Sequence, residues 1–301
     1  LCYGLGRAAI SKDRKRAQRS LEILVNDAIK PDDPGDPLEP LIHLLVRLDL
    51  IDQDAWAGEV TSRFLAEPSR YAGSLLHATS AALSLLRSPS IDSRQEGKCT
   101  DRVVQWLDEA TCAVADGVRQ LNRSGHGPDV DEKVKTSIKS LYETIDRIVM
   151  QLRFAINERG ATQDTMSASP AYRQKRDFYF KIKPLLEKIS SFALDKEIGV
   201  MFAPTTHWFM QLLNSVLAYD PEGVIHMAAD VVEASKPTGY HLDPLALNDF
   251  VPLVETTLAD HRYSVQEGEA LQDLLRLLDA FAESGDPKAL QLVWRLDELY
   301  R

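Results

Sequence analysis

Cysteine and long apolar runs are the two most obvious shortages in this sequence of 301 residues. The three cysteines, Cys2, Cys99 and Cys112, form no CxxC pair and no regular framework, which argues against a disulfide-stabilised or zinc-ribbon protein. No stretch approaches the roughly 18 consecutive apolar residues of a membrane span, and the first residues lack the basic-then-apolar order of a signal peptide. We therefore expect a cytoplasmic protein in a reducing environment, without a membrane partner.

Recognisable catalytic motifs are also missing. The sequence contains no G-x-S-x-G, no Walker phosphate loop, no HExxH and no His-Asp dipeptide of the metal phosphohydrolase type. Strand patterns are equally scarce, and Gly199-Val200-Met201-Phe202 is the only short candidate. We therefore expect an all-α chain that has no cofactor and whose function is more easily explained by binding than by catalysis.

The composition suits a folded protein. With 44% hydrophobic residues the chain can bury a substantial core, either as one large helical domain or as two sub-domains. The net charge of -10 disfavours contact with nucleic acid, which would repel the molecule. Basic residues are concentrated near the start, where Arg14, Lys15 and Arg16 could contact phosphates. Helical spacing distributes them around more than one face, so we expect no nucleic-acid binding at physiological salt.

The most regular pattern is a pair of long helices over residues 101–157. Each shows apolar or small residues at alternating spacings of four and three, which place them on one seam of a helix. The first seam is Val103, Leu107, Ala110, Val114, Gly117 and Leu121, and the second is Val134, Ile138, Leu141, Ile145, Ile148, Leu152 and Ala155. The turn-forming stretch 124–128 separates them, so the pattern predicts a long antiparallel hairpin.

Three regions follow from the helical patterns and the loops between them. Residues 1–30 predict a basic N-terminal helix, residues 38–195 a helical bundle around the hairpin, and residues 200–301 a series of shorter, stacked helix pairs. A polar stretch at 88–98 predicts a loop that leads into the hairpin.

Three Asp-Pro pairs, at Asp220, Asp243 and Asp286, predict the starts of shorter helices. Aspartate is a favoured N-cap, and proline is favoured in the first helical turn. The helices that follow are apolar on one face only, so each must pack this face against a neighbouring helix. In this respect the last hundred or so residues loosely resemble α-solenoid scaffolds of the HEAT or TPR kind. The resemblance implies stacked helix pairs with a protein-binding surface; the residues that mark a specific repeat family are not present at their spacing.

Several acidic and histidine residues raise the question of a metal site. The stretch Asp32-Asp33-Pro34-Gly35-Asp36 resembles the DDxxD motif of helical prenyl-transferring and terpene-forming enzymes, which implies magnesium and diphosphate binding. Here proline and glycine interrupt the motif, so we expect an Asp-rich turn instead. Glu39/His43 and Glu222/His226 each place a carboxylate and an imidazole one helical turn apart. Each supplies only two ligands, so we expect ordinary i,i+4 pairs and no metal.

Two sets of residues are candidates for contact with other molecules. His207 and Trp208 begin an aromatic stretch that could line a pocket, although a packed helix start is the simpler interpretation. Trp294, Arg295, Glu298 and Tyr300 combine aromatic and charged side chains near the end of the sequence, as in binding hot spots. Packing of Trp294 backward on Leu271, Leu274, Leu275 and Leu278 is the simpler interpretation there.

The functional expectation follows mainly from the absence of catalytic motifs and of a complete set of metal ligands. The sequence begins with Leu1 rather than Met, which suggests a piece of a longer polypeptide, and its general style suggests a bacterial source. We expect a non-catalytic helical scaffold or regulatory segment that contacts a protein partner or the missing domains of its own polypeptide. The alternative is a helical enzyme whose site is assembled from dispersed histidines such as His207, His226 and His241. The oligomeric state is left open.

Overall fold

The structure of the chain is a computed structural model. It describes residues 14–28, 39–51, 54–66, 72–86, 91–123, 128–158, 170–194, 206–236 and 239–299. Within these ranges the secondary structure consists of twelve α-helices and short 3₁₀ turns, with no strand, which confirms the predicted all-α class. The strand candidate at 199–202 lies outside the described residues. No described helix is long and apolar enough to cross a bilayer.

Contacts divide the chain into two compact units. The first comprises residues 1–117 and 126–151, and the second comprises residues 118–125 and 152–301. The boundary passes through the two long helices of the hairpin. The predicted regional boundaries at residues 30, 38, 195 and 200 stay predictions.

The first unit contains four helices before the hairpin. They are α2 (Arg14–Ala28), α3 (Glu39–Leu50), α4 (Ala55–Leu65) and α5 (Ala72–Leu86). Helix α3 packs against both α4 and α5, and Leu41, Leu45 and Leu75 are among the buried residues between them. Asp54 begins α4 by accepting hydrogen bonds from the backbone N–H groups of Trp56 and Ala57, at 3.0 and 3.4 Å.

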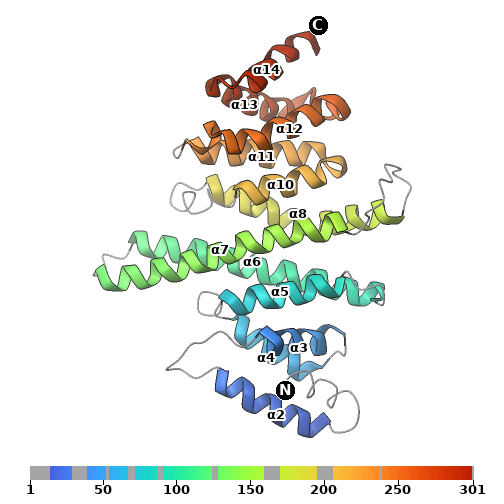
Figure 1. The fold of residues 1–301 in the computed structure, drawn as a ribbon, viewed down its shortest axis with the longest axis vertical. Helices are drawn as coiled ribbons and strands as arrows, with labels where there is room; N and C mark the ends of the chain where they lie inside the picture. Colours follow the sequence, from blue (N-terminus) through green and yellow to red (C-terminus); the bar gives the residue numbers. More distant parts are fainter. Residues whose placement is uncertain are drawn as a thin grey trace. The chain divides into compact units, whose positions relative to one another are not determined.

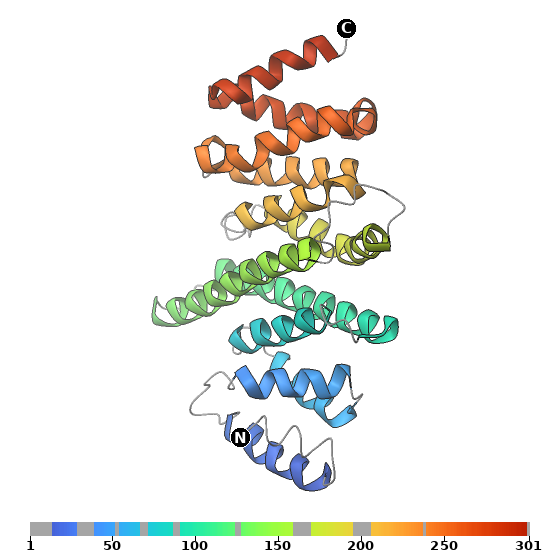
Figure 2. The ribbon, with the colours of Figure 1, turned by 45° about the vertical axis from the view of Figure 1, so that its right-hand side comes forward.

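The long helices α6 (Ser93–Arg123) and α7 (Pro128–Glu158) each have 31 residues. Figures 1 and 2 show them side by side, in agreement with the predicted hairpin. The seam residues that the structure describes are buried, from Val103 to Val114 on α6 and from Ile138 to Ala155 on α7. At Gly117 a Cβ atom would lie 2.9 Å from Ile138 Cδ1, so a larger residue there would require the isoleucine side chain to shift.

The start of α6 differs from the prediction. Residues 88–98 were expected to form a loop, but α6 begins at Ser93. Asp92 Oδ1 accepts from the backbone N–H of Gln95 at 2.8 Å, and Gln95 Oε1 accepts from the N–H of Asp92 at 3.1 Å. This reciprocal capping box satisfies two backbone donors and starts the helix eight residues before residue 101, where the predicted hairpin begins.

The second unit contains α8 (Pro170–Leu194), α10 (Thr206–Val216), α11 (Pro221–Ser235), α12 (Pro244–Asp260), α13 (Gly268–Ser284) and α14 (Pro287–Leu299). Its helices pack in two rows: α8, α11 and α13 follow one another in one row, and α10, α12 and α14 in the other. Contacts of α10 with α11 and of α13 with α14 join the rows. The successive levels can be followed in Figure 1 from α10 to α14.

The three Asp-Pro pairs begin helices as predicted. The carboxylate oxygen of Asp220 accepts from Gly223 N at 3.2 Å, that of Asp243 from Leu245 N at 2.8 Å, and that of Asp286 from Lys288 N at 2.9 Å. Each bond satisfies a backbone donor that has no partner inside its helix. The sequence therefore predicted the first residues of α11, α12 and α14.

Candidate functional site

A cluster of charged side chains joins α11 to α13. The His226 Nδ1 atom lies 2.8 Å from Asp273 Oδ2, and its Nε2 atom lies 3.8 Å from Asp230 Oδ2. Arg276 Nη1 lies 2.8 Å from Asp273 Oδ1 and 3.4 Å from Asp230 Oδ1. Both aspartates are 6% exposed. Two buried carboxylates are thus balanced by one guanidinium and one imidazole.

These contacts set the protonation of the cluster. The hydrogen bond to Asp273 raises the pKa of His226, burial opposes this effect, and the charge of Asp230 adds to it. Burial raises the pKa of Asp230, and His226 and Arg276 only partly offset that effect. Both nitrogens of the imidazole lie near carboxylates, so the cluster is best described as a bridge between two helices.

We expect His226→Ala to destabilise the second unit more at pH 6 than at pH 9. Because the pKa of His226 is raised in the folded state, its contribution is complete below the unfolded-state value near 6.5 and is lost as pH rises through the folded-state value. The effect should stay below about 1 kcal/mol because the side chain is half exposed. Urea unfolding at the two pH values measures it, with His261→Ala as the control. An equal loss at both pH values would contradict the assignment.

The predicted Glu222/His226 pair is a different contact in the structure. Both residues are exposed on α11, but the imidazole bonds to Asp273 of α13, which is 47 residues away in the sequence. The polar face of α11 is not exposed along its whole length, because Asp230 on that face is buried. Arg276 of α13 explains the difference, because its charge compensates the buried carboxylate.

His207, a candidate pocket residue, bonds to a second aspartate. Its Nδ1 atom lies 2.7 Å from Asp249 Oδ2, and its Nε2 atom lies 3.0 Å from Gln211 Nε2. The ring also contacts Trp208 edge-on, with 4.9 Å between centroids. Asp249 is 8% exposed, so the contact ties the start of α10 to α12. Both ring nitrogens of His207 therefore have hydrogen-bond partners within the protein, which fits the simpler interpretation of a packed helix start.

His241 lies in η4 (Tyr240–Leu242) and is 6% exposed. Its Nε2 atom lies 3.7 Å from Glu283 Oε2 of α13, while its Nδ1 atom is buried and has no hydrogen-bond partner among the described residues. The three histidines of the enzyme alternative thus face three different carboxylates. They pair with Asp249, Asp273 and Glu283, and no carboxylate is shared between them in the contacts described.

A further polar junction, which the sequence analysis assigned only as an N-cap, is centred on Asp220. Its Oδ2 atom accepts from Lys183 Nζ at 2.7 Å and from the Tyr179 hydroxyl at 2.8 Å, both on α8. Burial would raise the pKa of Asp220, but the bonds from Lys183, Tyr179 and Gly223 outweigh it and lower that pKa. A Cβ atom at position 223 would collide with the Asp220 carboxylate, so a side chain there would displace that carboxylate from its present position.

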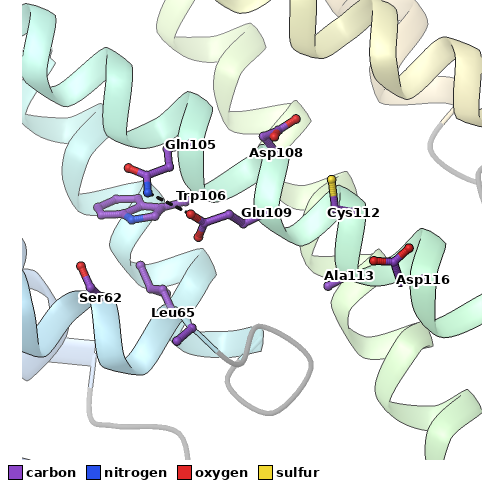
Figure 3. A pocket seen from close by; sticks show the side chains of 10 residues that line it. Ser62, Leu65, Gln105, Trp106, Asp108, Glu109, Cys112, Ala113 and Asp116 are labelled. Carbon is purple, nitrogen blue, oxygen red and sulfur yellow. Dashed lines mark hydrogen bonds between the residues drawn. The ribbon is translucent and has the colours of Figure 1, made fainter.

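The first unit contains a cleft of about 530 Å³ between α4 and α6. Figure 3 shows Leu65 and Trp106 on one side and the carboxylates of Asp108, Glu109 and Asp116 along α6. Glu109 accepts from Gln105 Nε2 at 2.9 Å. Among the ten described residues that line the cleft none is lysine or arginine, so the cleft would attract cationic groups and repel phosphate.

Comparisons with models of known protein families, with curated proteins and with solved structures found no significant match. No repeat family is identified. The arguments on function therefore rest on the side chains of this chain.

Trp294, the centre of the predicted partner surface, is 78% exposed on α14. The expected backward packing is wrong for this side chain. At about 100° per residue, Trp294 lies about 200° around the helix from the buried Leu292, and so on the opposite side. Arg295 and Glu298 lie on α14, but their side chains are outside the described set, as is Tyr300.

The predicted phosphate contacts and the acidic motif are described only in part. Arg14, Lys15 and Arg16 begin α2, and Lys15 is exposed. The interrupted DDxxD stretch at 32–36 lies outside the described residues. No contact of the described residues tests the nucleic-acid alternative.

Sequence reasoning missed the partners of the histidines. Asp249 and Asp273 stand on the amphipathic helices α12 and α13, and no local motif distinguishes them from ordinary surface acids. Their positions could have indicated a partner, because each aspartate falls on the apolar face of its helix. A buried carboxylate there needs a hydrogen-bond or ionic partner.

Proposed function

We propose that this chain is a non-catalytic helical scaffold that binds a protein partner through the Trp294 side of α14. The observation that carries the proposal is the 78% exposure of a tryptophan on a helix whose opposite side is buried. The partner is another protein or another part of a longer polypeptide that contains this chain.

The packing of α14 supports a binding role for its outer side. Ala289 and Leu292 are 0% and 3% exposed, and α14 packs against α12 and α13. The helix is therefore held without any contribution from the exposed indole. A large apolar side chain in water forgoes the free energy that its burial would provide, and tryptophan is enriched in binding hot spots.

The two-row stack of the second unit also favours a scaffold. Each helix packs against the next helix of its row. The outer sides of several short helices are therefore available to a partner, as in α-solenoid scaffolds. The enzyme alternative has weaker support, because His207, His226 and His241 face separate carboxylates. A role for Arg14, Lys15 and Arg16 in phosphate contact has no observation in its favour beyond the charge of α2.

We expect Trp294→Ala to weaken partner binding at least about 30-fold without changing the melting temperature. Truncation of a hot-spot residue costs about 2 kcal/mol or more, which is a loss of affinity of about 30-fold. A photo-crosslinking residue at the exposed position 291, one helical turn from Trp294 on α14, introduced in cells of the source organism, would identify the partner and leave the indole in place. The purified partner would then be titrated against the native chain and against Trp294→Ala.

The matched control is Tyr263, which is 80% exposed in η5 (Arg262–Val265) of the same unit. A crosslinker at 263 should not give the product seen at 291, and Tyr263→Ala should bind the partner as the native chain does. A lowered melting temperature for Trp294→Ala, with unchanged binding, would instead assign the indole to the packing of the unit and refute the proposal.

A further inference from the structure

The Glu39/His43 pair of α3 has a third potential ligand, which comes from another helix. Glu39 and His43 lie one turn apart on α3, and the Glu39 Oε1 atom is 3.7 Å from His43 Nε2. Helix α5 packs against α3 and brings His77 to the same place. The His43 and His77 rings are 6.5 Å apart between centroids and inclined by 56°. The sequence showed only the first two members, because His77 is distant from them along the chain.

The potential ligand atoms of these residues converge. One carboxylate oxygen of Glu39 and one ring nitrogen each of His43 and His77 all lie within 4.8 Å of one another. At metal–ligand bonds of about 2.0–2.1 Å, neighbouring ligands of a tetrahedral ion are roughly 3.3 Å apart. The spacing between Glu39 and His43 is close to this value, and small side-chain rotations would bring all three into range.

An unsatisfied atom lies within this group. His43 Nε2 is buried and has no hydrogen-bond partner among the described residues. Buried polar atoms in folded proteins almost always have a partner, so a group that lacks one needs an explanation. A bound ion would supply the missing partner, because the lone pair of a neutral imidazole nitrogen is a good metal ligand.

We propose that Glu39, His43 and His77 form a binding site for a divalent transition-metal ion, and that zinc is the best match. Two imidazoles and one carboxylate are a donor set that suits zinc, whereas magnesium and calcium prefer oxygen ligands alone. Three protein ligands leave a fourth position open. The site would therefore bind its ion together with a water molecule or an outside ligand.

The test is metal titration of the full chain after chelator treatment and removal of the chelator. Zinc binding is measured by calorimetry, and cobalt binding by the visible absorption of the ion. We expect one saturable site, and perturbation by zinc of the imidazole nuclear magnetic resonance signals of His43 and His77. His43→Ala and His77→Ala should each weaken zinc binding at least about tenfold, and Glu39→Gln should weaken it without removing a ring.

The matched control is His226→Ala, because His226 also lies beside two carboxylates. This variant should bind zinc as the native chain does. His77→Gln keeps most of the side-chain volume and shows whether loss of binding reflects the ligand or the fold, which circular dichroism checks in parallel. Absence of a saturable site, or equal affinity in the native chain and the His43→Ala/His77→Ala double variant, would overturn the proposal.

Discussion

Replacement of Leu141 or Ile145 by aspartate should unfold the first unit. Both side chains are 0% exposed on the buried seam of α7. An aspartate at either position would have to bury a charge without a partner or take up a proton, and the apolar contacts of the original side chain would also be lost. Together these effects should cost about 4 kcal/mol or more, a large part of the 5–15 kcal/mol that typically stabilises a domain.

Lys139→Asp is the control for this prediction, because Lys139 is exposed on the same helix. It introduces the same aspartate into the same helix, so the residue that is introduced is matched while burial differs. Its effect should stay within about 0.5 kcal/mol. Thermal melts followed by circular dichroism compare the three variants. Equal melting temperatures for all of them would show that the seam does not hold the unit together.

The features that the sequence predicted are those that depend on residues near one another in the chain. The seam of α7 follows from the period of an α-helix, since Ile138, Leu141 and Ile145 must fall on one face wherever the helix packs. The N-caps at Asp220, Asp243 and Asp286 act within three residues. Both kinds of signal are local, and the structure contains both.

The features that the sequence did not predict depend on which helices become neighbours. His226 was assigned to Glu222 because both lie on α11, but its closest carboxylate is on α13. His77 lies on α5, and only the packing of α5 on α3 brings it near Glu39 and His43. The helical period of a sequence predicts which face of a helix is buried. It does not predict which other helix packs against that face.

Two errors had local causes. The start of α6 was predicted too late because its first residues lack the apolar period, whereas the Asp92/Gln95 capping box in the sequence marks the true start. Backward packing of Trp294 was the simpler of its two interpretations, because Trp294 lies close in the sequence to the apolar residues Leu292 and Val293. The angle of about 200° between Trp294 and Leu292 would have indicated the exposed side.

Loss of Asp220 should destabilise the second unit more than loss of any other of the three Asp-Pro caps. Its carboxylate caps α11 through Gly223 N and also accepts from Lys183 and Tyr179, so it joins α8 to α11. Asp220→Ala removes the cap and leaves the part-buried ammonium and hydroxyl groups of α8 without this acceptor. We expect a cost on the order of 3 kcal/mol, against about 1 kcal/mol for the cap alone.

Asp243→Ala is the matched control, because Asp243 also precedes a proline and caps α12 through Leu245 N, but at an exposed position. The pH dependence gives a second readout. The pKa of Asp220 is lowered in the folded state, so its ionic contribution is present above the unfolded-state value near 3.9 and is lost as pH falls through the folded-state value. The difference in unfolding free energy between the native chain and Asp220→Asn should therefore be constant from pH 5 to 8 and shrink below about pH 4. If Asp220→Ala costs no more than Asp243→Ala in urea unfolding, the bonds to Lys183 and Tyr179 add nothing to the cap, and α8 must be held on α11 by its apolar contacts alone.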